Sequence, residues 1–269
     1  MSNSLPMQNA ILSQYRTTGN LDARIRLHRD YSTNPQGWFA WYLDQLDLAP
    51  GSRILEIGCG PAALWKDQPA RMDPSWQLVL SDFSPGMVRA ARQNTLAHLR
   101  YANLDAQALP FPSGYFDAVL ANHMLYHVPD QPRAAAEIRR VLKAGGRLYA
   151  ATNGETHMTG LDELIERLAP ALAPSRDHEV TRWRTSFTLE NGTDLLRRSF
   201  DEVRIIRYLD DLRITAARPV VDYTLSMVAN SAQELPGETI TAFEAALEQE
   251  LAQHGCIFIH KDAGIFIAR

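Results

Sequence analysis

Apolar residues follow two alternating patterns between residues 53 and 152: short continuous runs, and residues spaced as on one face of a helix. The continuous runs predict five strands, over residues 53–57, 76–81, 99–104, 115–121 and 147–152. The helical spacings predict helices over residues 86–96 and 131–142. Strands that alternate with helices in this way are typical of a parallel sheet covered by helices on both faces.

The pattern is less regular on either side of this core. Before it, helical spacing predicts helices over residues 21–28 and 38–46. After Asn153 it predicts further helices and a sixth strand: helices 161–168, about 218–229 and 237–253, a helical segment within 187–200, and strand 203–208. Two apolar runs, 256–260 and 264–268, flank Lys261-Asp262-Ala263 and predict a terminal hairpin with at least one antiparallel strand.

Composition narrows the possible settings and partners. The chain has 269 residues, a net charge of −4 and a pI near 6.1, which gives no electrostatic reason to expect nucleic-acid binding. Cys59 and Cys256 lie far apart in the sequence, so we expect no structural disulfide and a reduced, cytoplasmic setting. The first 20 residues do not resemble a signal peptide, and no apolar stretch approaches the roughly 20 residues that span a bilayer, so we expect no membrane insertion.

Acidic residues and glycines stand where the first three predicted strands end. Glu56 lies inside the apolar run of the first strand, where a carboxylate is costly unless a partner binds it. Gly58 and Gly60 follow and allow the backbone to approach a ligand closely. Asp82 and Asp105 end the next two strands. Because the carboxyl ends of parallel strands meet at one edge of a sheet, and one carboxylate can accept both ribose hydroxyls, this pattern predicts a nucleoside-type site.

The segment Gly58-Cys59-Gly60-Pro61-Ala62-Ala63 also fits the dinucleotide pattern G-x-G-x-x-G/A. That pattern needs a diphosphate at a helix N-terminus, where Pro61 has no N–H to donate. Glu56 beside the glycines would repel phosphate and attract a cationic group. The residues therefore favour a ligand with a ribose and a positively charged amino-acid end, as S-adenosylmethionine has.

Four segments resemble successive motifs of the class I S-adenosylmethionine-dependent methyltransferases, above all the small-molecule branch typified by the ubiquinone and menaquinone methyltransferases. They are ILEIGCGPAALW, SDFSPGMVRAA, NLDAQALPFPSGYFDAVLANHMLYHV and EIRRVLKAGGRLYAAT, and the resemblance covers roughly residues 38–153. It implies a Rossmann-like α/β fold with a seven-stranded, mostly parallel sheet and an antiparallel final strand. It also implies methyl transfer to an O, N or C atom of a small-molecule acceptor, with S-adenosylhomocysteine as product. One departure is Ala62, where the family has a third glycine.

The resemblance also implies roles for residues at the matching positions. Those expected to contact the methionine end of the cofactor are Glu56, Gly58, Gly60 and Asn122. Those expected to contact its nucleoside are Asp82 at the ribose, Phe83 and Met87 beside the adenine, Asp105 at the adenine amino group and the Ala106 N–H at the ring. Tyr31 is a looser candidate for closing over the cofactor.

His123 and His127 follow the fourth strand, where the transferred methyl group is expected. A histidine there could remove a proton from the acceptor, because its ordinary pKa lies near neutral pH. The alternative is that these residues only shape the loop. Their spacing of four also suggests metal ligands, but no third ligand stands nearby in the sequence, so we expect no metal site.

We expect a single domain of residues 1–269. Its parts would be N-terminal helices (1–50), a cofactor-binding core (51–153), a substrate cap (154–200) and C-terminal strands and helices that complete the sheet (201–269). A nucleic-acid methyltransferase, a non-catalytic cofactor-binding module and a nicotinamide enzyme on a similar sheet remain alternatives. The sequence does not identify the acceptor, and it leaves a monomer and a homodimer equally open.

Overall fold

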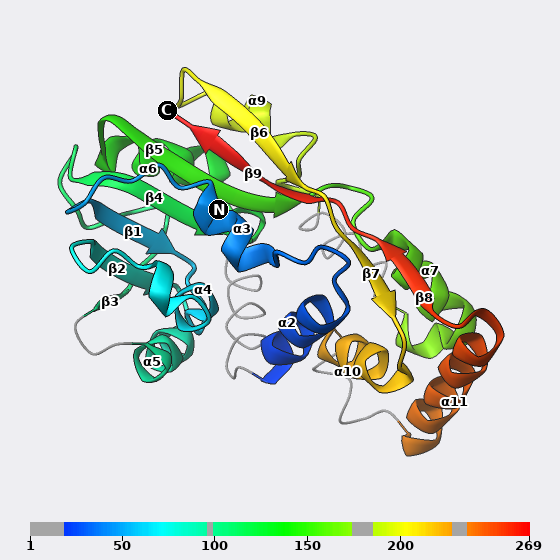
Figure 1. Ribbon diagram of the computed structural model, residues 1–269. Helices are drawn as coiled ribbons and strands as arrows, with labels where there is room; N and C mark the ends of the chain where they lie inside the picture. Colours follow the sequence, from blue (N-terminus) through cyan, green and yellow to red (C-terminus); the bar gives the residue numbers. More distant parts are fainter. Residues whose placement is uncertain (1–18, 96–98, 174–184, 228–235) are drawn as a thin grey trace.

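The computed structural model describes residues 19–95, 99–173, 185–227 and 236–269. Seven strands form the main sheet in the order β3-β2-β1-β4-β5-β9-β6 (Figure 1). They are β1 (Arg53–Ile57), β2 (Gln77–Asp82), β3 (Arg100–Asn103), β4 (Phe116–Asn122), β5 (Leu142–Asn153), β6 (Val203–Tyr208) and β9 (Ala263–Ala268). Only β9 runs antiparallel to its neighbours, β5 and β6. The predicted sheet, mostly parallel with an antiparallel final strand, is confirmed.

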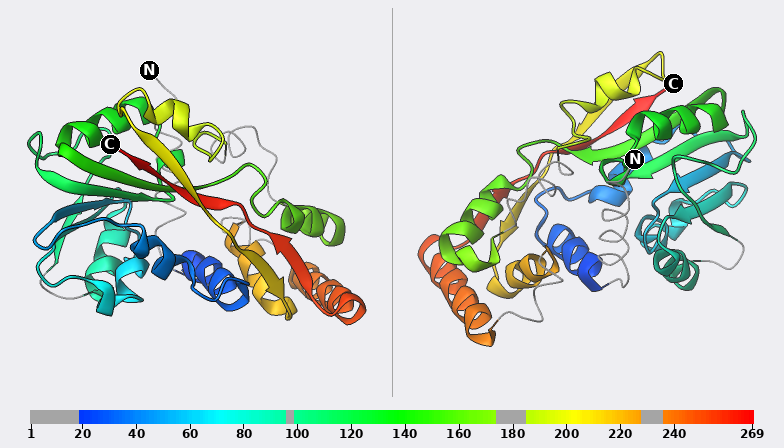
Figure 2. Two further views of the ribbon diagram at one scale, coloured as in Figure 1. Left: turned by 45° about the horizontal axis from the view of Figure 1, so that its top comes forward. Right: turned by 180° about the vertical axis from the view of Figure 1, so that it is seen from behind.

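Helices cover both faces of the main sheet (Figures 1 and 2). One face carries α3 (Trp38–Asp44), α4 (Ala63–Lys66) and α5 (Pro85–Asn94), and the other carries α6 (Gln131–Val141) and α9 (Gly192–Leu196). Strand β1 shows why both faces need cover. Leu55 and Ile57 are buried on the α6 side, whereas Ile54 is buried on the α4 side. Glu56, two residues along from Ile54, therefore faces the α4 side.

A second group of elements lies beside the main sheet, and we call it the second lobe. Strands β7 (Asp211–Ile214) and β8 (Ile257–His260) form a two-stranded antiparallel sheet. Around it lie α2 (Gly19–Tyr31), α7 (Thr159–Leu168), α10 (Ala217–Met227) and α11 (Gly237–His254) (Figure 1). The lobe has its own apolar cluster, which includes Leu27, Leu161, Leu212, Val220 and Phe243. No helix in the described part of the chain is long and apolar enough to cross a bilayer.

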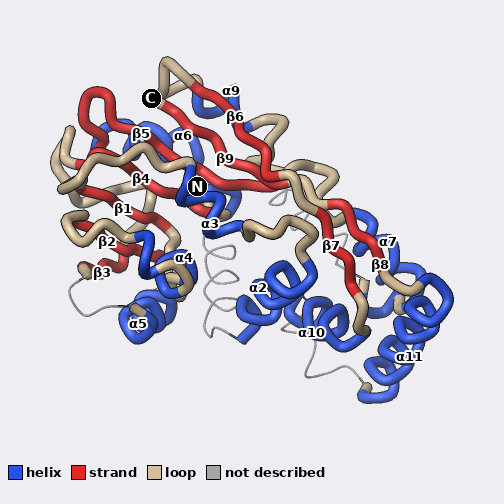
Figure 3. The backbone as a smooth tube through the Cα atoms, viewed as in Figure 1, coloured by secondary structure: helices blue, strands red, loops and turns tan. Residues whose placement is uncertain are grey.

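The predicted terminal hairpin is wrong. Strands β8 and β9 do not pair with each other; β8 pairs with β7, and β9 pairs with β5 and β6. Figure 3 shows the two strand paths, β6 into β7 and β8 into β9, running side by side from the main sheet into the second lobe. Every residue of β9 is buried, as in a central strand covered on both faces, whereas β8 alternates between buried and exposed residues, as in a strand covered on one face.

The predicted substrate cap is divided between the two parts of the molecule. Helix α7 belongs to the second lobe, whereas α9 packs on the main sheet. Residues 174–184 of this segment lie outside the described residues, as do residues 1–18 of the predicted N-terminal helices. The C-terminal segment completes the main sheet through β6 and β9 alone.

A buried ion pair holds the joint between the main sheet and the second lobe. Tyr208 lies opposite Ala263 and Asp211 opposite His260, so the register continues without a break and places Asp210 opposite Lys261. Their side chains are 0% and 6% exposed, and the Lys261 ammonium donates to the Asp210 carboxylate.

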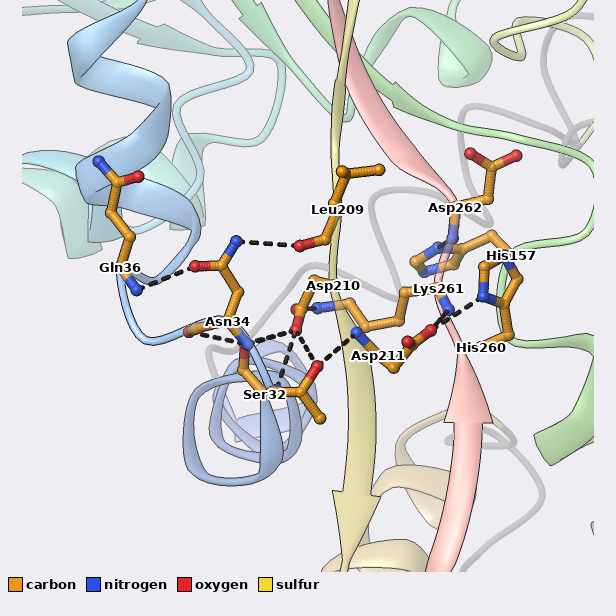
Figure 4. A network of polar contacts seen from close by, with 11 residues as sticks. Ser32, Asn34, Gln36, His157, Leu209, Asp210, Asp211, His260, Lys261 and Asp262 are labelled. Atoms are coloured by element: carbon orange, nitrogen blue, oxygen red, sulfur yellow. Dashed lines mark hydrogen bonds and ion pairs between the residues drawn. The ribbon is translucent and has the colours of Figure 1, made fainter.

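The segment that follows α2 binds the same carboxylate. Asp210 Oδ1 accepts hydrogen bonds from the Ser32 hydroxyl (2.8 Å) and from the Thr33 and Asn34 N–H groups (3.0 Å each) (Figure 4). Burial alone would raise the pKa of Asp210, but the hydrogen bond and charge of Lys261 outweigh it and hold the pKa below its ordinary value. Asp210 therefore connects the segment between β6 and β7 to the end of α2.

We predict that Lys261→Met lowers the free energy of unfolding by about 3–5 kcal/mol, because it leaves a buried carboxylate without its cation. The double variant Asp210→Asn/Lys261→Met, in which the amide oxygen can still accept from the Ser32–Asn34 segment, should lose only about 1 kcal/mol. Urea denaturation of the wild type, the single variant and the double variant measures both values. Equal losses in the two variants would contradict the assigned role of the charge.

Candidate active site

The candidate site lies at the carboxyl ends of β1, β2 and β4, where the strand order of the sheet reverses. The glycine turn after β1 is tied to β2 by two hydrogen bonds. The Cys59 N–H donates to the Ser81 carbonyl (2.8 Å), and the Gly60 N–H donates to Asp82 Oδ2 (2.9 Å). These hydrogen bonds therefore hold the glycine turn after β1 against Asp82 at the end of β2.

Gly58 is required at its position by conformation and by space. Its φ is +68°, and a Cβ built there would lie 2.7 Å from Cβ of Met124, in the loop after β4. Ala62 also has a left-handed conformation (φ +61°), although it carries a side chain. This conformation costs an L-residue roughly 1–2 kcal/mol, so the departure from the family's glycine at position 62 introduces local strain.

We predict that Gly58→Ala lowers the free energy of unfolding by about 2–4 kcal/mol, the sum of the left-handed conformation and the overlap with Met124. Gly51→Ala is the matched control, because Gly51 has a φ of +77° but no atom within 4 Å of a built Cβ. The control should lose only roughly 1–2 kcal/mol. Urea denaturation of both variants measures the difference, and equal losses would show that Met124 yields without cost.

Glu56 is buried and held by two donors. Its Oε2 accepts from the Trp65 indole N–H, and its Oε1 accepts from the Asn122 amide (3.1 Å). Burial raises the pKa of Glu56 to about 7, and the hydrogen bonds from Trp65 and Asn122 oppose that rise only in part. Our sequence reasoning missed Trp65, although it stands in the motif ILEIGCGPAALW nine residues after Glu56.

Asn122 has an acceptor to spare beside this carboxylate. Its Oδ1 is buried and accepts no hydrogen bond from a described residue. The nearby Tyr42 hydroxyl donates instead to the Tyr149 carbonyl (3.2 Å). Glu56 and Asn122 therefore offer carboxylate and amide oxygens close together, a donor set that suits an ammonium group.

The raised pKa of Glu56 predicts a specific pH dependence of stability. The folded chain holds a proton on Glu56 up to pH about 7, whereas the unfolded chain releases it near the ordinary value of 4.5. Stability should therefore fall as pH rises from 4.5 to about 7, by about 3 kcal/mol for this residue, and remain lower above that range. Glu56→Gln keeps an oxygen for Trp65 and should remove this part of the fall. Urea denaturation at several pH values tests it; parallel profiles for the two proteins would refute the assignment.

Asp82 has lone pairs available for a ligand. Its Oδ1 accepts from the Ser84 N–H (2.8 Å) and its Oδ2 from the Gly60 N–H (2.9 Å). A carboxylate has about four lone-pair sites, so each oxygen can accept one more hydrogen bond. Burial raises the pKa of Asp82 despite these two donors. The Ser84 side chain caps α5 by accepting from the Met87 N–H (3.4 Å), so it also fixes the direction in which the chain leaves Asp82.

The remaining predicted cofactor residues are placed less tightly. Phe83 is 37% exposed and Met87 is buried. Asp105 stands after β3, where its carboxylate accepts from the Gln107 N–H (2.9 Å) and side-chain amide, and Ala106 is buried behind it. Tyr31 packs against the apolar cluster of the second lobe. Hydrogen bonds link Glu56 to Asn122 and the glycine turn to Asp82, but no such contact joins Asp105 or Tyr31 to them.

His123 and His127 occupy different surroundings. His123 has a positive φ of +51°, and its ring lies 5.2 Å from that of Trp38. The ring of His127 lies 4.5 Å from that of Tyr126. Burial lowers the pKa of both histidines to about 4; nearby Lys261 adds to this for His123, and Arg24 for His127. Both imidazoles are therefore neutral at pH 7 and weak as bases. Among the described residues, no group of three or more His, Cys, Asp or Glu could hold a metal ion.

Comparison with known proteins agrees with this geometry. Residues 55–150 match the family described as "Methyltransferase domain". The ubiquinone/menaquinone biosynthesis C-methyltransferase UbiE of Bordetella avium is 33% identical over 143 residues, which make up 52% of this chain and 51% of that protein. The chain thus spans about half the length of this curated relative.

Solved structures show the same fold. A putative methyltransferase from an antibiotic biosynthesis pathway of Anabaena variabilis superposes with a TM-score of 0.60 at 16% identity, covering 85% of this chain and 95% of that one. Phosphoethanolamine N-methyltransferase 2 of Haemonchus contortus, solved with S-adenosylhomocysteine, gives 0.51 at 18% identity, covering 87% of this chain and 53% of that one. Residues 55–150 are thus similar to a methyltransferase domain, and the main sheet has the Rossmann-like fold of these solved structures.

Proposed function

We propose that this protein transfers a methyl group from S-adenosylmethionine to a small-molecule acceptor. The observation that carries the proposal is the hydrogen-bonded unit at the point where strand order reverses. There the Gly60 N–H binds Asp82, and Glu56 and Asn122 lie side by side at the ends of β1 and β4. This unit falls within the segment that matches the methyltransferase domain.

The residues present fit this cofactor. The free lone pairs of Asp82 suit two ribose hydroxyls, and the oxygens of Glu56 and Asn122 suit the ammonium of the methionine end. When bound, the cofactor supplies an electrophilic methyl group on its sulfonium. The work left to the protein is alignment of the acceptor and exclusion of water. A base is needed only where the acceptor is not already a free nucleophile, so His123 and His127 stay candidates for that role.

The short α4 argues against a dinucleotide. A diphosphate is bound by the N–H groups and dipole of a helix that starts after the glycine turn. Here that helix has only four residues, and Pro61 precedes it without an N–H. The acidic net charge likewise gives no support to a nucleic-acid substrate.

We predict that Asp82→Ala weakens S-adenosylmethionine binding by about 1–3 kcal/mol, because ribose hydroxyls lose their acceptor in a partly buried site. Asp73→Ala is the control, since Asp73 is a partly exposed residue in the turn before β2, where its carboxylate binds Ser75. Isothermal titration calorimetry on the three proteins measures the affinities. An unchanged affinity in Asp82→Ala would remove Asp82 from the site.

The same calorimetry with NAD tests the function itself. We expect binding of S-adenosylmethionine and S-adenosylhomocysteine and none of NAD. Tight NAD binding without S-adenosylmethionine binding would overturn the proposal. Release of S-adenosylhomocysteine during incubation with candidate acceptors then separates an enzyme from a non-catalytic binding module.

A further inference from the structure

Histidines from three separate elements gather between the carboxyl ends of the main sheet and the second lobe. They are His28 of α2, His123 after β4 and His157 after β5. The ring centroids of His28 and His157 are 6.0 Å apart. A charge on His123 would lower the pKa of His28 and of His157, and the charge of Lys261 lowers the pKa of all three. Of these three residues, only His123 was singled out from the sequence.

These imidazoles lie between the carboxyl ends of the main sheet and the second lobe. Part of each remains accessible. Even so, burial lowers the pKa of His28 to about 3 and that of His123 to about 4, and it holds the pKa of His157 well below its ordinary value.

Two of the rings have defined hydrogen-bonding states. His157 Nδ1 accepts from the Asp262 N–H (3.2 Å), so the proton of the neutral ring is on Nε2, which is left to donate. His28 Nδ1 is buried and has no hydrogen-bond partner among the described residues. A buried imidazole nitrogen without a partner is costly, and a bound ligand would remove that cost.

Arg24 adds a cation one helical turn from His28 on the same face of α2. It is partly buried, and its Nε and Nη2 donate to the hydroxyl (3.1 Å) and carbonyl (2.7 Å) of Ser226. A guanidinium has five N–H groups, so three remain. No carboxylate of a described residue lies within ion-pair distance of Arg24, and its charge reaches His127, whose pKa it lowers.

Two ion pairs lie close to these histidines. Lys261 is bound to Asp210, and Asp262 is bound to Arg207 (Figure 4 shows the first of these). Among the described residues, Arg24 is then a cation without a paired carboxylate, beside imidazoles that are neutral at pH 7 and can donate. Such surroundings disfavour a cationic ligand and favour an anion.

We infer that the acceptor is an organic anion, whose acidic group is bound by Arg24 and His28 between the main sheet and the second lobe. The inference rests on the proposed function and adds the chemical class of the acceptor. An apolar body suits the aromatic residues beside His123, where the Trp38 ring packs 5.2 Å from that of His123 and 5.3 Å from that of Tyr208. Aromatic carboxylates have both features.

Calorimetry with benzoate and its neutral isostere benzamide tests the inference on the full chain, with and without saturating S-adenosylhomocysteine. We expect benzoate to bind about tenfold more tightly than benzamide. Arg24→Gln should lose about tenfold in benzoate affinity and leave the affinity for S-adenosylhomocysteine unchanged. Arg29→Gln is the matched control, because Arg29 is an exposed arginine on the same helix and pairs with Asp30. It should change neither affinity.

Arg24→Lys separates the charge from the contact with Ser226. It keeps the cation and one donor, so we expect benzoate affinity within about threefold of the wild type. An equally large loss in Arg24→Lys and Arg24→Gln would make the helix contact the cause and contradict the inference. Equal binding of benzoate and benzamide would also overturn the inference. Inorganic phosphate serves as a second anionic probe, and failure of the chain to bind either benzoate or phosphate would overturn the inference as well.

The cofactor's own carboxylate is the competing partner for Arg24. If Arg24→Gln weakens S-adenosylhomocysteine instead of benzoate, the guanidinium serves the cofactor and the inference is wrong. Failure of the wild type to bind S-adenosylhomocysteine would count against the proposed function. The comparison of benzoate with benzamide on the cofactor-free chain would still decide the inference.

Discussion

The arrangement of this molecule depends on the buried pair of Asp210 and Lys261. The pair lies between β6 and β7 on one strand path and between β8 and β9 on the other, where both paths leave the main sheet for the second lobe. Without the ion pair, each path would carry one buried, unpaired charge at this point. Asp210 also accepts hydrogen bonds from the Ser32–Asn34 segment and so fixes the end of α2. Because α2 carries Arg24 and His28, an electrostatic joint outside the cofactor site sets where the proposed acceptor groups lie.

Local sequence patterns were sufficient to predict the strands and helices of the parallel part of the sheet. Strand β1, its glycine turn and Asp82 could be placed in this way, because a buried strand flanked by glycines and capped helices has few alternatives. Prediction was wrong where pairing is long-range. Residues 256–268 look like a hairpin, but β9 pairs with β5 and β6, and β8 pairs with the four-residue β7, which sequence reasoning did not find. Nothing local distinguishes the two pairings.

Candidate site residues show the same division. Glu56 and Asp82 were identified because acidic residues at strand ends are conspicuous, whereas Trp65, the donor that holds Glu56, looks like an ordinary core aromatic in the sequence. Arg24 and His28 carry no signal at all. They lie on an amphipathic helix among other arginines. Only the folded chain shows that Arg29 is exposed and paired, whereas no carboxylate of a described residue pairs with Arg24. Whether an arginine can bind a ligand depends on whether a carboxylate already pairs with it, and only the folded structure shows that.

The two sides of the proposed site differ in charge in a way that suits the reaction. Glu56 and Asp82 give the cofactor side an acidic character, which matches a cationic ammonium and sulfonium. Arg24 and the neutral histidines give the acceptor side the opposite preference. Where the bound acidic group is itself the nucleophile, methyl transfer from the sulfonium removes one charge of each sign. A site with little water between the two ions therefore loses less solvation on reaching the transition state than water does.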